Sequence, residues 1–132
     1  MPSKIYLRDT LHVGIPKVYE CPAPSTAFMV VFEDDGETGY LYGLDGSRAD
    51  QPILDALHIY NVSDVADKDT PATVEIVWTD DGLKVCLVIN RYPHAVFDFE
   101  ARRAYCRNNF PPPDLVFTTS HQWDENVLAL FK

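Results

Sequence analysis

The sequence predicts an α+β fold dominated by β-structure, with an antiparallel, meander-like sheet of six or seven strands and one C-terminal helix. Three observations lead to this prediction. Asp-Gly pairs separate runs of apolar residues that have the length of strands, which is the pattern of β-hairpins. A hydrophobic fraction of 46% indicates an ordered globule. The final segment, from Thr119 onward, has apolar residues at helical spacing.

The length of 132 residues suits one core, and no change in composition divides the chain, so we expect residues 1–132 to form a single domain. No apolar run approaches the roughly 18 residues that cross a bilayer. Arg8 and Asp9 interrupt the N-terminal segment before a signal-peptide core can form. The three cysteines are an odd number without CxxC spacing. We therefore expect a soluble cytoplasmic protein with reduced thiols and no membrane partner.

The first predicted elements are two strands and a hairpin. "KIYLR" predicts a strand, and the proline-rich "PKVYECPAPS" is compatible with an edge strand. "STAFMVVFEDDGETGYLYGLD" predicts a hairpin turning at Asp35-Gly36, which places Phe32 opposite Gly39 and leaves room for the ring. The run "AFMVVF" is apolar on both faces and predicts a strand in the interior of a sheet.

The next segment, "DQPILDALHIYNV", has two interpretations. Asp50 and Pro52 are typical of a helix start, whereas "LHIYNV" has the composition of a strand. We expect a short helical turn near residue 53 that leads into a strand. The polar "SDVADKDTP" that follows is interpreted as a loop.

A second hairpin, "TVEIVWTDDGLKVCLVIN", gives the clearest pattern. A turn at Asp81-Gly82 places six apolar residues on one buried face. The predicted pairs are Trp78 with Val85, Ile76 with Leu87, and Val74 with Ile89. A shift of one residue would set Trp78 opposite Lys84, so the apolar pattern fixes the register.

A third hairpin is predicted in "NRYPHAVFDFEARRAYCRNNFPPP". With residues 100–103 as its loop, Phe97 lies opposite Cys106 on the core side and Val96 opposite Arg107 on the other. The three prolines predict an extended segment, either a strap across the end of a sheet or a ligand for an aromatic groove.

The last predicted element is the terminal helix. Thr119 and Gln122 have the spacing of a capping box, and Trp123, Val127 and Leu130 form one apolar stripe. We expect this helix to lie over the sheet.

The charge distribution suggests a partner. The net charge is −9, and residues 33–81 carry 13 acidic and 2 basic side chains. Such a field repels phosphate backbones, which excludes nucleic acid as the expected ligand, and attracts a basic protein. The predicted partner-facing residues are Asp34, Asp35 and Glu37, in an acidic turn. The alternative is that the surplus charge only maintains solubility.

No catalytic residue, cofactor site or metal site is predicted. The histidines at 12, 58, 94 and 121 lack the paired spacing of zinc ligands, and no nucleophile elbow or phosphate-binding loop is present. Cys106, opposite Phe97, is expected to be buried and inert rather than a nucleophile. An enzymatic activity remains open.

A basic and aromatic patch is the alternative binding site. Its members lie on the outer side of the third hairpin, and arginine and tyrosine are enriched where interfaces gain their binding energy. They are Arg91, Tyr92, His94, Arg103, Tyr105 and Arg107. This patch predicts an anionic ligand or substrate, or else ion pairs with the acidic remainder of the molecule.

The segments "WTDDG", "INRYPHAVFDFEARRAYCRNNFPPP" and "HQWDE" resemble a family of small uncharacterised bacterial proteins, a domain of unknown function. The resemblance runs from about Val74 to Asp124 and implies a bacterial cytosolic protein. It implies no activity or cofactor. The leading hypothesis is therefore a small acidic protein-binding module, of inhibitor or immunity type. The alternatives are the small-molecule site on the patch and a homodimer formed through an exposed strand edge.

Overall fold

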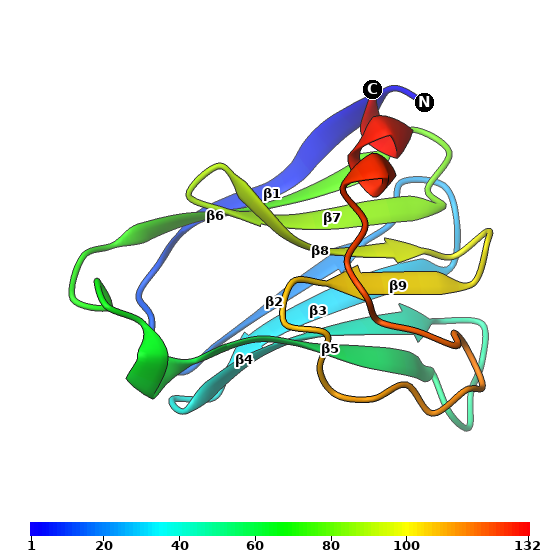
Figure 1. Ribbon diagram of the computed structural model, residues 1–132. Coiled ribbons are helices and arrows are strands. Elements are labelled where there is room, and N and C mark those ends of the chain that lie inside the picture. The colour runs from blue at the N-terminus through cyan, green and yellow to red at the C-terminus, as the bar shows by residue number, and fades with distance from the viewer.

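Residues 1–132, all described by a computed structural model, form two antiparallel sheets (Figure 1). Sheet A has the strand order β1-β6-β7-β8-β9 and sheet B the order β2-β3-β4-β5. The strands are β1 (Ser3–Leu11), β2 (Lys17–Pro22), β3 (Phe28–Asp34), β4 (Thr38–Asp45), β5 (Ile53–Asn61), β6 (Ala72–Thr79), β7 (Lys84–Ile89), β8 (Tyr92–Asp98) and β9 (Arg103–Cys106), and the two 3-10 helices are η1 (Val62–Asp64) and η2 (Glu125–Phe131).

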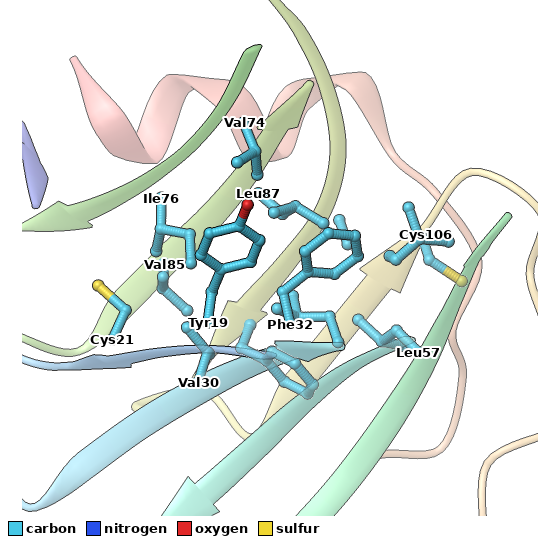
Figure 2. Close-up of a cluster of buried hydrophobic side chains, with 14 of the residues drawn as sticks. Tyr19, Cys21, Val30, Phe32, Leu57, Val74, Ile76, Val85, Leu87 and Cys106 are labelled. Carbon is cyan, nitrogen blue, oxygen red and sulfur yellow. The ribbon is translucent and has the colours of Figure 1, made fainter. Parts of the chain in front are cut away.

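The prediction of a β-dominant antiparallel fold is confirmed, but the strands do not form one sheet of six or seven. Nine strands divide into two layers, because the apolar inner face of each sheet is buried against the other. Figure 2 shows side chains of both sheets meeting in this core, with Phe32 and Leu57 from sheet B and Leu87 and Cys106 from sheet A. Neither helix is long and apolar enough to cross a membrane.

The β6–β7 hairpin confirms its predicted register. Trp78 pairs with Val85, Ile76 with Leu87, and Val74 with Ile89. All six side chains belong to the core, where Phe97 and Cys106 of the next hairpin join them. The prediction succeeded here because alternation on both strands excludes a shift of one residue, and the turn centred on Asp81-Gly82 was placed correctly.

The other two hairpins differ from prediction by two residues. Phe32 pairs with Leu41 instead of Gly39, and Phe97 pairs with Ala104 instead of Cys106. In the first hairpin Gly36 has a φ of +98° and occupies the first central position of the turn, as type II′ geometry requires. A shift of two leaves every side chain on its predicted face.

Two glycines of β4 give room to rings, although not to the ring of Phe32. A Cβ at Gly43 would lie 2.9 Å from the Phe97 ring across the core, and one at Gly39 would lie 2.7 Å from the Tyr60 ring. Because these two positions of β4 carry no side chain, neighbouring aromatic rings can approach its backbone there.

The prediction of a helical turn near residue 53 is wrong. Ile53–Asn61 is strand throughout, because it pairs with β4 along its length with two register shifts. Helical structure appears only after it, as the short η1. The ladder with β4 overrides the local helix-start signal of Asp50 and Pro52.

The terminal helix lies over sheet A as expected, but it is a 3-10 helix that begins later than the predicted capping box. Asp124 caps it by accepting a hydrogen bond from the Asn126 amide. The preceding residues stay extended because Gln122 forms a bridge with Cys106 of β9. Val127 of η2 packs on the outward side chains of Cys86 and Val96.

Candidate functional site

The outer face of sheet B is apolar in its centre and is covered by no helix (Figure 1). Alternation along β2, β3 and β4 turns Cys21, Phe32 and Leu41 into the core and their neighbours outward. We call these outward residues the sheet B face. They are Val18, Glu20, Met29, Val31, Glu33, Tyr40, Tyr42 and Leu44, each exposed or half-buried and none in a core cluster.

Aromatic rings form a row across this face. The rings of Tyr40 and Tyr42 lie 6.0 Å apart between centroids and are nearly parallel. Tyr40 also meets the ring of His58 edge-on at 5.3 Å, and His58 meets Phe110 in the same way at 5.7 Å. The His58 amide donates to the Phe110 carbonyl, so the segment after β9 covers the β5 side of the sheet and ends the row there.

The sheet B face also carries carboxylates, and none of its residues is basic. Glu20 and Glu33 belong to the face, and β3, β4 and β5 contain no lysine or arginine. Burial, with repulsion from Glu33 as the next cause, raises the pKa of the Tyr42 hydroxyl. Tyr42 is therefore a neutral hydrogen-bonding group at neutral pH, within a negative field.

Of the three predicted partner-facing acids, Asp34 does not face a partner, because its side chain is buried and the residue is 1% exposed. Its carboxylate accepts hydrogen bonds from the Tyr60 hydroxyl at 2.7 Å and from the Gly14 and Gly36 amides at 2.8 Å. It thus ties the loop after β1, the β3–β4 turn and β5 together. Sequence could not separate it from its neighbours, since burial within an acidic turn depends on that inward tyrosine.

Asp35 and Glu37 are exposed at the β3–β4 turn, as the prediction requires. The Asp35 carboxylate accepts hydrogen bonds from the Thr38 and Glu37 amides, which lower its pKa. Asp35 therefore stays charged at neutral pH beside the sheet B face. Whether a partner contacts Asp35 or Glu37 stays a prediction.

The structure brings together part of the predicted basic and aromatic patch. Its centre is Arg107, whose guanidinium lies 4.4 Å from the Tyr92 ring centroid and 3.9 Å from that of Trp123. The same guanidinium donates to the Pro93 carbonyl at 2.9 Å and forms an ion pair with Glu125. Arg107 therefore holds the C-terminal segment against β8 and has little free surface for an anion.

The other members of the patch differ in their contacts. Arg103 lies over Tyr105, at 6.0 Å from its ring centroid, and lines a surface depression with Trp123 and Glu125. Arg91 lines a shallow polar depression with Arg8, away from Arg107. His94 stays beside Arg107, because its carbonyl accepts a hydrogen bond from the Arg107 amide at 3.2 Å and its ring meets Tyr92 edge-on, but it lines a cavity that does not include Arg107. The structure therefore keeps Tyr92, His94 and Arg107 together, whereas Arg91 lines a separate depression.

The surroundings of Cys106 disfavour a role for its thiol as a nucleophile. The thiol is buried, which raises its pKa, and it donates to the Phe110 carbonyl. His121, whose carbonyl accepts a hydrogen bond from the Cys106 amide, uses its ring elsewhere: Nε2 donates to Asp55 at 2.6 Å and Nδ1 to the Pro111 carbonyl. Burial opposes the charge on His121, but these two hydrogen bonds raise its pKa. This arrangement is a buried ion pair, not an activated nucleophile.

The sequence interpretation missed Val31, Tyr40 and Tyr42 as candidate binding residues. The signal was present in "AFMVVF", which is apolar on both faces. It correctly predicted an interior strand, since β3 lies between β2 and β4. Only the inner face of that strand meets the core, however, and the run gives no sign that the other is uncovered.

Comparison with known proteins finds relatives of unknown activity. The profile of a family described as "Uncharacterized protein conserved in bacteria (DUF2251)" matches residues 11–132. A protein of Haemophilus influenzae, named "Uncharacterized protein", is 46% identical over 113 residues, which cover 83% of this chain and 69% of the relative. No solved structure gives a significant match.

Proposed function

The chain belongs to this family of uncharacterised bacterial proteins, and we propose that it is a protein-binding module whose sheet B face docks a basic partner protein. One observation supports this proposal above the others. An interior strand, β3, presents apolar side chains on both faces, and the chain covers only one of them. A second protein that covered Val31, Tyr40 and Tyr42 would remove this apolar surface from water.

The dimensions of the face suit such an interface. Three strands spaced about 4.8 Å apart, each rising about 3.3 Å per residue, form a patch of roughly 14 by 20 Å. With the acidic turn beside it, this patch can provide part of the roughly 800 Å² that one partner buries in a standard interface. Tyrosine at the centre and charge at the rim is the arrangement in which aromatic contacts set affinity and carboxylates set association rate.

The acidic rim selects the chemistry of the partner. Glu20, Glu33, Asp35 and Glu37 repel an acidic surface and attract lysine or arginine. An inhibitor or immunity-type protein that masks a basic surface has these properties. We place this role in the cytoplasm, where the buried free thiols of Cys21, Cys86 and Cys106 remain reduced.

The proposal is tested by affinity capture from the native bacterial lysate at low salt, followed by calorimetry with the purified partner. We expect a basic protein whose affinity for the Tyr42→Ala variant falls about 30-fold, the effect of losing roughly 2 kcal/mol at an interface centre. Glu33→Gln should mainly slow association. Tyr6→Ala, on the exposed outer strand β1, is the matched control and should leave binding unchanged.

Two outcomes would contradict the proposal. If wild type and Tyr42→Ala retain the same proteins with the same affinity, the sheet B face is not the docking surface. If sedimentation shows a wild-type dimer that Val31→Asp dissociates, the occupant of the face is a second copy of the chain and not a basic partner.

A further inference from the structure

A cavity of about 290 Å³ opens at one end of the sandwich, remote from the centre of the sheet B face. The loop of residues 62–71 runs beside it from β5 of sheet B to β6 of sheet A, at the left end of Figure 1. Val13, Val65, Ala72 and Ile89 supply apolar wall, and Tyr60 and His94 supply aromatic rings. The cavity thus lies where the two sheets separate and no strand closes the core.

His94 gives this cavity a polar group without a partner in the protein. Its ring touches Tyr92 edge-on at 5.1 Å, yet no hydrogen bond to either ring nitrogen is formed. Burial, with the nearby charge of Arg107 as the second cause, lowers the pKa of His94 to about 4. A neutral imidazole offers one donor and one acceptor nitrogen at neutral pH.

The other residues of the lining that can form hydrogen bonds through their side chains are Tyr60, Asp67, Thr70 and Asn90, of which Tyr60 and Asn90 are already engaged within the protein. The Tyr60 hydroxyl donates to Asp34 at 2.7 Å, so it is fixed in place and its oxygen alone can accept a further bond. Asp67 is the charged residue of the lining, and its carboxylate disfavours an anion. The chemistry therefore favours an uncharged molecule with a hydroxyl group and an apolar body.

We propose that this cavity binds a small, uncharged, mostly apolar ligand whose hydroxyl group forms a hydrogen bond with His94. The size suits one aromatic ring with substituents, because benzene occupies an apolar cavity of about 150 Å³. The site shares no residue with the sheet B face, so it is a second binding function that stands or falls separately. It also differs from the predicted anion site, since Arg107 does not line it.

The experiment uses para-fluorophenol as the probe and fluorine NMR as the measurement. We expect saturable broadening of the probe resonance with the full-length protein, together with a shift of the His94 ring protons in a proton NMR spectrum. The anionic analogue para-fluorobenzoate should bind at least about 10-fold more weakly. Saturable binding of both probes with equal affinity would overturn the assignment of an uncharged ligand.

Two variants and one control locate the site. His94→Phe preserves the ring and removes the hydrogen bond, which should weaken binding about 10-fold, equivalent to roughly 1.4 kcal/mol. Ala66→Trp, at an exposed position of the lining, should block the cavity without disturbing the core. His12→Phe, an exposed histidine outside this cavity, should bind like wild type.

Unchanged binding by Ala66→Trp would overturn the proposal, even if His94→Phe failed to fold. Absence of saturable binding at millimolar probe concentration would do so as well. Neither result bears on the basic partner, because that test measures a protein complex on the sheet B face.

Discussion

The outer faces of the two sheets carry similar side chains and have different surroundings. On sheet A, Cys86 and Val96 point outward and are 4% and 0% exposed, because Val127 of η2 packs over them. On sheet B, Val31 and Tyr42 point outward from equivalent interior strands and remain half-buried. The chain supplies its own cover for one face and none for the other.

This difference separates folding from binding. Burying apolar surface stabilises by roughly 25 cal/mol per Å² whether the cover comes from the same chain or from another. The sheet A face already contributes this stabilisation to the fold. The sheet B face does not, so its free energy is available to a partner. Mutations on the two faces should therefore have opposite consequences for stability and for complex formation.

The largest effect is expected at the ion pair that anchors the cover of sheet A to the edge of sheet B. His121 is 0% exposed and meets Asp55 of β5 at 2.6 Å. Asp55→Ala leaves a buried imidazole without its acceptor, and the free energy of unfolding should fall by about 3–5 kcal/mol. Urea denaturation measures this loss. The exposed Asp50→Ala is the control, and an equal loss in both variants would show that the pair is not an anchor.

The anchor also marks the limit of what the sequence predicted. Local alternation fixed the β6–β7 register through Trp78 and Val85, and it assigned the correct faces in all three hairpins. The turn centres of the other two hairpins were missed by one residue. In the β3–β4 hairpin the reason is that Asp-Gly does not reveal whether glycine takes the first or second central position. His121 and Asp55 are 66 residues apart, and no periodic pattern connects them.

The candidate site was less predictable than the fold. Asp35 and Glu37 were correctly placed at an exposed turn, whereas Asp34 in the same run is buried. Whether an outward strand face is covered depends on where a distant segment packs. The apolar stripe near Val127 predicted a cover for one sheet, but the division into two sheets, which leaves Tyr42 uncovered, follows from long-range pairing.

The comparison of faces is tested directly by placing one carboxylate on each. Val127→Asp inserts a charge between η2 and sheet A, against Cys86 and Val96, and should lower the free energy of unfolding by about 2–4 kcal/mol. Val31→Asp on the sheet B face should cost less than about 1 kcal/mol, because water already reaches that site. Similar losses in urea denaturation would mean that both faces belong to the fold.

The anchor should also give a pH dependence of defined sign. Because the folded-state pKa of His121 is raised above its unfolded value of about 6.5, its contribution is fully present below that pH and is lost as pH rises through the folded pKa. The stability gap between wild type and Asp55→Ala should therefore narrow as the pH rises above about 6.5. Urea denaturation across this range measures the gap. A gap that widened with pH would show that His121 is not the charged partner.

The smallest effect concerns Arg107, whose guanidinium packs against the rings of Tyr92 and Trp123 and so holds the cover of sheet A in place. Lysine keeps the charge but loses the flat guanidinium that stacks on both rings and donates to the Pro93 carbonyl. Arg107→Lys should lower stability by about 1 kcal/mol and increase hydrogen exchange in η2, while exchange in β3 and β4 stays as in wild type. Arg103→Lys is the matched control, because the Arg103 guanidinium lies farther from a ring, at 6.0 Å from the Tyr105 centroid. Equal exchange in η2 for both variants would indicate that the cover is held by its apolar contacts with Cys86 and Val96, and that the stacked arginine adds nothing to the asymmetry between the two faces.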